Sequence, residues 1–260
     1  MSKSAAVTLV VCLSTFAVSC PSNYRQVSES VCVIHAGASR TFCEACQKCS
    51  DYGKARGDLV FLHGRNVELI KTMLPKGIAL WNGMNGLLDL PDGRTAEGWR
   101  DLDPRTPEFV SGPDQFQWAR NEPDAGEPHL VYNSSTGRMW DNNGGPLPFS
   151  REIYCEYGGL LPKGDFKLKY QSSFPKKFAN IMHTDKRFVG CPSEVQARTK
   201  IDCALRCSLD MTCRSSYFNG ENRKCVHMLH ADSLIPVSIA VAADGWTRFA
   251  KTEYPSPLLV

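Results

Sequence analysis

The apolar residues near the start of the chain follow helical spacing in two places. Residues 42–49 place Phe, Ala and two Cys side chains at i, i+3, i+4 and i+7, the pattern of one buried helical face. Thr41 and Glu44 form a capping-box pair at the front of this segment. Residues 67–74 repeat the helical spacing with Val, Ile and Leu, and Pro75 ends that helix.

Shorter apolar runs predict strands. Residues 59–62, Leu-Val-Phe-Leu, form a short buried strand between the two helices. From Ile78 onward, short strands alternate with long loops rich in Gly, Pro and Asn. Two helices followed by looped strands predict an α+β fold.

The first residues predict export from the cell. A short positive start precedes a mainly apolar run over residues 5–18, and the small residues Ala17 and Ser19 stand where a signal peptidase reads. We expect a signal peptide over residues 1–19 and a secreted, extracellular protein. Because the run is short and no later stretch reaches transmembrane length, we expect no membrane span.

Charge and cysteine content narrow the class of protein. The 260 residues carry a net charge of only +3, which argues against a dedicated nucleic-acid-binding protein. Twelve cysteines indicate an oxidising compartment, and eleven remain once Cys12 leaves with the signal peptide. We find no Ser/His/Asp constellation and no phosphate-binding glycine loop in a helix context, so we expect no enzyme.

A lysine-rich stretch divides the chain. Residues 161–187 contain seven basic residues against two acidic ones and show little hydrophobic periodicity. We interpret this stretch as an inter-domain segment, with the linker proper over residues 158–171. Its charge can contact polyanionic glycans, but a solvated linker is the favoured interpretation.

Residues 20–157 resemble a C-type lectin-like domain, in which two helices accompany looped antiparallel sheets. The resemblance rests on the aromatic–alanine–cysteine pattern of residues 42–49, on Gly57-Asp58-Leu59-Val60, on Trp81-Asn82-Gly83-Met84 and on the closing Tyr154-Cys155-Glu156. It implies two disulfides, Cys20–Cys32 in the N-terminal hairpin and Cys49–Cys155 from the first helix to the last strand.

The chain departs from this family in the long loop region. The disulfide that braces that loop in the family has no cysteines here, and His129 or Leu130 and Gly145 stand roughly in their places. Losing such a bridge typically costs a few kcal/mol. We therefore expect either packing or a bound ion to hold the loop.

Acidic residues on both sides of that loop suggest a cation site. The candidate ligands for Ca²⁺ and a sugar are Glu122, Asp124, Glu127, Asp141 and Asn142. Clustered carboxylate and amide oxygens without a nearby imidazole suit a hard cation such as Ca²⁺. The resemblance implies that the Glu122–Pro123 bond is cis and that the ion coordinates two vicinal hydroxyls of a sugar.

Two details of this motif differ from the family. Glu-Pro-Asn accompanies mannose-type sugars there and Gln-Pro-Asp galactose-type sugars, whereas Glu122-Pro123-Asp124 is a hybrid that predicts neither. Asp141-Asn142 reverses the family's Asn-Asp order. An acidic loop that binds no ion, as in lectin-like domains that recognise proteins, remains an alternative. A glycosidase pair is disfavoured because nothing in the sequence indicates the required separation.

The last third of the chain resembles a PAN/apple domain, a small disulfide-stapled α+β module, over residues 172–255. Thr199 and Asp202 predict the start of its helix. The resemblance implies the pairs Cys203–Cys225 and Cys207–Cys213 and an adhesive role toward proteins or carbohydrates. A zinc site using Cys225, His227 and His230 is possible in principle but disfavoured against disulfides.

Several features stay open. Cys43, Cys46 and Cys191 have no assigned partner: the first two can close a local disulfide, and Cys191 is either a candidate for a covalent homodimer or a buried thiol. Arg56-Gly57-Asp58 spells an integrin-type tripeptide, which we interpret as coincidence. Asn133-Ser134-Ser135 is a glycosylation sequon whose glycan could shape access to the ion site.

Together these features predict a secreted recognition protein. The first hypothesis is Ca²⁺-dependent binding of a carbohydrate or glycoprotein by the lectin-like domain, with adhesion to a protein or glycan by the PAN-like domain. The alternative is a Ca²⁺-independent protein-binding or matrix-assembly protein. The missing loop disulfide, the Asp141-Asn142 order and the spare cysteines favour the alternative.

Overall fold

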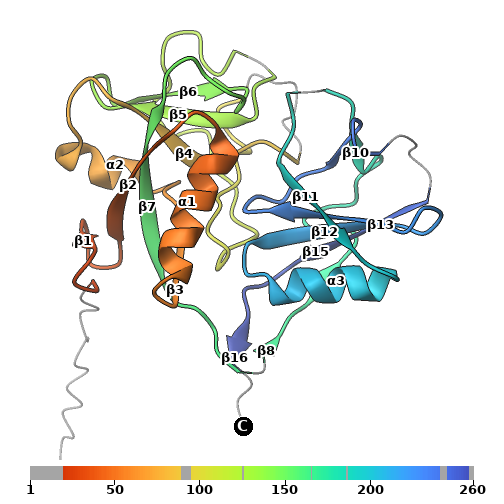
Figure 1. Cartoon of the computed structure of the whole chain (residues 1–260). Coiled ribbons are helices and arrows are strands. Elements are labelled where there is room, and N and C mark those ends of the chain that lie inside the picture. Colours follow the sequence, from red (N-terminus) through yellow and green to blue (C-terminus); the bar gives the residue numbers. More distant parts are fainter. Residues whose placement is uncertain are drawn as a thin grey trace, which may run out of the picture.

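The computed structural model describes residues 20–88, 95–124, 126–164, 166–185, 187–240 and 245–257. The predicted signal peptide, residues 1–19, lies outside the described residues. Two α+β halves lie side by side, and each contains a sheet with a helix packed on it (Figure 1). Within these ranges, no helix combines the length and apolar character needed to cross a membrane.

The two predicted helices of the first half are present. Helix α1 spans Phe42–Lys54, and the Thr41 side chain caps it by accepting from the Glu44 N–H at 3.2 Å. The Glu44 carboxylate accepts from the Arg40 N–H rather than that of Thr41, so the return bond of the capping box is shifted by one residue. Helix α2 spans Val67–Ile70 and continues as the 3₁₀ turn η1, Lys71–Met73.

The first sheet has the order β1-β2-β7-β4-β5-β6, and β3 pairs with β7 on the side opposite β2, the same side as β4. The strand bounds are Arg25–Gln26 (β1), Cys32–Ser39 (β2), Asp58–Leu62 (β3), Ala79–Asn85 (β4), His129–Asn133 (β5), Arg138–Asn142 (β6) and Arg151–Leu160 (β7). Strand β3 is buried along its whole length, as its apolar sequence predicts. A long loop joins β4 to β5 and carries part of the candidate site.

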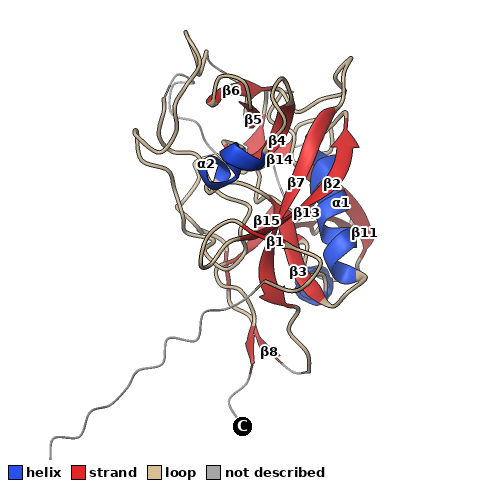
Figure 2. Ribbon diagram, turned by 90° about the vertical axis from the view of Figure 1, so that its left-hand side faces the viewer, coloured by secondary structure: helices blue, strands red, loops and turns tan. Residues whose placement is uncertain are grey.

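Helices α1 and α2 cover opposite faces of this sheet (Figure 2). Alternation along the strands produces the two cores, since successive side chains of a strand point to opposite faces. Trp81 and Cys155 pack with α1, whereas their neighbours Leu80 and Tyr154 pack with α2. The sequence pattern and the packing therefore agree on this half of the fold.

The second half is built on an antiparallel sheet of order β11-β13-β12-β15-β9. Its elements are β8 (Phe166–Lys167), β9 (Tyr170–Gln171), β10 (Met182–His183), β11 (Cys191–Gln196), α3 (Lys200–Leu209), β12 (Cys213–Asn219), β13 (Lys224–Leu229), β14 (Ile235–Pro236), β15 (Trp246–Lys251) and β16 (Ser256–Pro257). Thr199 caps α3 by accepting from the Asp202 N–H at 3.1 Å, at the predicted helix start.

The structure refines the predicted linker of residues 158–171. Strand β7 continues to Leu160 because its end pairs with Asp58 of β3. Strand β9 pairs with Lys251 and Ala250 of β15 and so joins the second sheet. The segment between the halves is therefore shorter than the lysine content alone indicates.

Disulfides join elements within each half and between the halves. The four pairs that the family resemblances imply are all formed: Cys20–Cys32, Cys49–Cys155, Cys203–Cys225 and Cys207–Cys213. A fifth, Cys43–Cys191, links α1 to the first residue of β11 across 148 positions. The candidate local disulfide between Cys43 and Cys46 and the candidate covalent homodimer through Cys191 are therefore both wrong for this structure. Among the described cysteines, Cys46 is free and buried.

Candidate calcium and ligand site

Three carboxylates from two separate segments meet at the edge of the first half. Glu122 and Asp124 lie on the loop before β5, on either side of Pro123, and the Glu122–Pro123 bond is cis as the resemblance implies. Asp141 comes from β6. One carboxylate oxygen of each lies within 4.8 Å of the others. We call Glu122, Asp124 and Asp141 the acid triad.

The acid triad contains carboxylate oxygens without hydrogen-bond donors. Asp141 is only 4% exposed, and its Oδ1 accepts from the Asp124 N–H at 3.3 Å. Its Oδ2 and the Oε2 of Glu122 are buried and have no hydrogen-bond partner among the described residues. Because a buried charged oxygen is costly without a donor or cation, these two atoms fit a hard metal ion.

The pKa values of the acidic residues show the same uncompensated charge. Burial raises the pKa of Glu122 to about 8, helped by the neighbouring Asp141 carboxylate, which would accept from a protonated Glu122, and by the negative charges of Asp141, Asp124 and Glu127. Burial and the charges of Asp141 and Asp124 also raise the pKa of Glu127, against a smaller opposing effect of Arg187. The region therefore favours either a bound proton or a bound cation.

Only three of the five predicted ligands belong to the acid triad; Glu127 and Asn142 lie outside it. Glu127 lies close enough to the triad for its charge to affect Glu122. The Asn142 side chain is engaged elsewhere, because its Oδ1 accepts from the Gly144 N–H at 3.0 Å and shapes the turn after β6. The reversed Asp-Asn order thus places the carboxylate, and not the amide, in the triad.

Packing takes the place of the missing loop disulfide. The buried His129 ring lies 4.3 Å from the Phe42 ring, centroid to centroid. On its other side it touches Gly144, where an added Cβ would come within 2.3 Å of His129 Nδ1. The Phe42 N–H donates to the Gly144 carbonyl at 3.2 Å. The loop that follows Asp141 is therefore fixed to the start of α1 without a covalent bond.

Arg187 is a neighbour of the site that the sequence reasoning missed. Its guanidinium lies over Gly126, where an added Cβ would come within 2.4 Å of Nη2, and it attracts the charges of Glu127 and Asp124. It also pairs with Asp185 at 2.7 Å. Arg187 stood out only as one basic residue of the inter-domain segment, because its position depends on how the two halves pack.

A second acidic cluster in the same half is fully paired. It contains Asp101, Asp103 and Glu156, and we call it the paired acid cluster. Its partners are Arg65, Arg105, His63 and Asn66. Asp103 accepts from Arg65 Nη2 at 2.9 Å and from Arg105 Nε at 2.8 Å. Burial raises the pKa of Asp101 to about 6, and the Arg65 charge opposes that rise.

Other sequence motifs do not form sites. Asp58 of the integrin-type tripeptide is buried and accepts from the Tyr24 hydroxyl at 2.9 Å, so it is no loop-tip ligand. The zinc interpretation is wrong because Cys225 is bound to Cys203. His227 Nε2 lies 3.0 Å from the Cys203 carbonyl oxygen, a backbone contact.

The sequon is displaced from the acid triad in space. Asn133 pairs with Arg138 at the turn of the β5–β6 hairpin, whereas Asp141 pairs with Leu130. Along β6, Arg138 and Asp141 are three residues apart, which corresponds to about 10 Å at the usual rise of a strand. A glycan on Asn133 would therefore begin at the far end of the hairpin and not between the halves of the site.

Comparison with known proteins gives structural likeness alone. No protein-family model matches the chain, and no curated protein matches it. Among solved structures, it is similar to the human scavenger receptor C-type lectin carbohydrate-recognition domain, with 19% identity and a TM-score of 0.38 over 53% of this chain and 98% of that chain.

Two further solved structures match with similar identity, TM-score and coverage. A calcium-independent type II antifreeze protein matches with 17% identity and a TM-score of 0.38, over 55% of this chain and 96% of that chain. Human lithostathine matches with 17% identity and a TM-score of 0.34, over 60% of this chain and 99% of that chain. The similarity is to C-type lectin-like structures and covers about half of this chain.

Proposed function

We propose that residues 20–157 form a Ca²⁺-dependent carbohydrate-recognition domain of a secreted protein. The observation that supports this most directly is the acid triad, in which Asp141 Oδ2 and Glu122 Oε2 are buried and no described residue donates to them. Oxygen ligands of this kind are those that Ca²⁺ prefers. The disulfides within and between the halves support an oxidising, extracellular setting.

Glu122, Asp124 and Asp141 would hold the ion, and Glu127 would add negative charge beside it. Bound Ca²⁺ would supply coordination positions for two vicinal sugar hydroxyls, as the resemblance to C-type lectins implies. The chain itself orients the ligands, since the Asp124 N–H fixes Asp141 Oδ1 and leaves Oδ2 free. The hybrid Glu-Pro-Asp motif leaves the class of sugar to experiment.

The second half would add adhesion, as its resemblance to PAN/apple domains suggests. Its helix is attached to the sheet by Cys203–Cys225 and Cys207–Cys213, the pairs expected for that domain class. We propose a protein or glycan partner for this half and no catalytic role for the chain.

One set of observations favours a Ca²⁺-independent protein-binding or matrix-assembly function instead. The Asn142 amide is used in a turn, the loop is held by the packing of His129, and Arg187 places a positive charge beside Glu127. Each of these reduces what a bound ion would have to do. The two functions differ in their response to chelation.

A glycan array separates the two functions. We would probe the secreted chain and the Asp141→Asn variant in Ca²⁺ and again in EDTA. Binding by the unaltered chain that disappears in EDTA and in the variant supports the Ca²⁺-dependent function. Binding that survives both changes, or none on the array, contradicts it and favours the alternative. Glu194→Gln, an exposed change in the second half, is the control for altered charge.

A further inference from the structure

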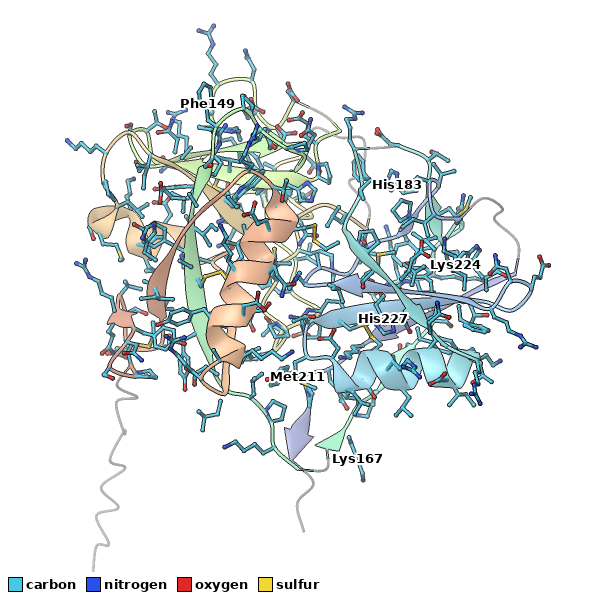
Figure 3. The ribbon with its side chains drawn as sticks, viewed as in Figure 1. Phe149, Lys167, His183, Met211, Lys224 and His227 are labelled. Carbon is cyan, nitrogen blue, oxygen red and sulfur yellow. A yellow bond between two sulfur atoms is a disulfide. The ribbon has the colours of Figure 1, made fainter. Side chains whose placement is uncertain are left out.

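A cavity of about 390 Å³ lies between the two halves. One wall is formed by α1 and β3, with Cys46 and Leu59, and the other by the end of α3 and the turn after it, with Leu209 and Met211. Figure 3 shows Met211 between the lower end of α1 and α3. The volume falls in the range of roughly 300 to 1,000 Å³ that is typical of small-molecule sites.

The acidic side chains of the cavity are already engaged. Asp58 accepts from the Tyr24 hydroxyl at 2.9 Å. Asp210 Oδ1 accepts from the Thr212 N–H at 2.8 Å and from the Thr212 hydroxyl at 2.7 Å. The remaining wall is mainly apolar, so these carboxylates do not define what the cavity binds.

Arg214 is a cation in the wall of the cavity that forms no ion pair with a described residue. Its Nε donates to the His230 carbonyl at 2.9 Å, and Nη2 donates to the Leu102 carbonyl at 3.5 Å. Among the described residues, no carboxylate forms an ion pair with it. Burial lowers its pKa to about 10, against the attraction of Asp103 and other neighbours. A guanidinium held only by carbonyls, with Nη1 making no hydrogen bond to a described residue, is suited to a carboxylate.

Other cations around the cavity differ in their engagement. Arg206 pairs with Asp202 at 3.0 Å on the surface of α3. Lys54 lies exposed at the end of α1 and adds positive charge at the rim. The cavity thus combines apolar walls with the Arg214 guanidinium, which forms no ion pair with a described carboxylate, and with Lys54 at the rim.

We propose that this cavity binds a small amphipathic carboxylate, with its carboxylate on Arg214 and its apolar body between Leu209, Met211 and the β3 wall. This ligand site is separate from the acid triad and does not depend on the proposed calcium function. It also gives a role to the junction of the halves that the Cys43–Cys191 disulfide fixes.

Decanoate is a suitable probe, with 1-decanol as the uncharged match. Calorimetric titration of the secreted full chain, below the solubility and micelle limits of both, should show saturable decanoate binding. Arg214→Gln should weaken it by about tenfold to a hundredfold, the usual range for a hydrogen bond to a charged group. Lys224→Gln, on the far side of the second half in Figure 3, should leave it unchanged.

Decanoate that does not bind, or that binds Arg214→Gln as tightly as the unaltered chain, overturns the proposal. Equal affinity for 1-decanol also overturns it, because the carboxylate would then have no role.

Cys46 gives a second readout that needs no substitution. It lines the cavity and is the free cysteine among the described residues. We expect N-ethylmaleimide to alkylate it slowly and decanoate to slow that reaction severalfold, with a much smaller effect of 1-decanol at the same concentration. Because burial raises the pKa of the Cys46 thiol, we expect the reaction to need hours at alkaline pH. Alkylation at a rate that decanoate leaves unchanged contradicts the proposal.

Discussion

The acid triad and the paired acid cluster place similar numbers of carboxylates in the same half of the molecule, but among the described residues only the paired acid cluster forms ion pairs with arginine. Arg65 and Arg105 bind Asp103 in the paired acid cluster, and His63 binds Glu156. In the acid triad, Asp141 Oδ2 and Glu122 Oε2 are buried and receive no hydrogen bond from any residue that the structure describes. The charges of the paired acid cluster are therefore balanced by protein side chains, whereas the acid triad needs a bound proton or cation.

This difference teaches that a group of acidic residues is not in itself a metal site. Desolvated carboxylates with positive partners contribute to folding, and removal of one partner leaves an uncompensated charge. Desolvated carboxylates without partners favour an external cation. The variants described next change the paired acid cluster, the packing beside the acid triad, a buried histidine and the triad itself.

Arg65→Gln is expected to have the largest effect on stability. It leaves Asp101 and Asp103, both buried, without one of their charged partners, so the free energy of unfolding should fall by about 3–5 kcal/mol. Urea unfolding with and without Ca²⁺ measures the change, and Ca²⁺ should not restore it. Arg206→Gln, which breaks an exposed pair on α3, should cost less than about 1 kcal/mol. Equal losses in the two variants would contradict the comparison.

His129→Ala tests what holds the loop beside the acid triad. Removing the buried ring leaves a cavity between Phe42 and Gly144 and should lower the free energy of unfolding by about 2–4 kcal/mol. Addition of Ca²⁺ should recover part of this loss if the ion also braces the loop. The control is His35→Ala, because His35 is about half exposed. A loss no larger than that of the control would show that packing does not replace the missing disulfide.

His230→Asn extends the comparison to a buried neutral group of the second half. Burial and the Arg214 charge lower the pKa of His230 to about 4, so its stabilising contribution is complete above about pH 6.5 and is lost as the pH falls toward 4. Asn tolerates the positive φ of 64° at this position and does not titrate.

The free energy of unfolding should therefore fall between pH 7 and 4 by about 2–3 kcal/mol less in His230→Asn than in the unaltered chain. The same slope in both proteins would mean that His230 does not titrate in this range. Exposed His35→Asn serves as the comparison variant.

Local signals predicted much of the fold. The apolar face of residues 42–49, the Thr41 and Thr199 caps and the buried strand of residues 59–62 all depend on short-range physics, and the structure has them in the expected places. The family resemblance added the four disulfides and the cis bond at Pro123, which no periodicity could supply.

Contacts between segments far apart in the chain could not be predicted from the sequence. The Cys43–Cys191 disulfide joins the start of α1 to the start of β11, and Arg187 of the second half lies over Gly126 of the first; both contacts depend on how the two halves meet. The use of Asn142 in a turn depends on the backbone of Gly144. These outcomes are fixed by the packing of the two halves and by loop geometry, which residue spacing does not encode.

The central claim, that the acid triad binds Ca²⁺ because it lacks partners, is tested most directly by calorimetric titration of Ca²⁺ into the secreted chain. We expect one saturable site, lost in Glu122→Gln and in Asp141→Asn and retained in the control Glu194→Gln. In the absence of Ca²⁺, Asp141→Asn should unfold no more easily than the unaltered chain, because it removes repulsion among the carboxylates. Absence of Ca²⁺ binding by the unaltered chain, or binding that both triad variants retain, would contradict the account.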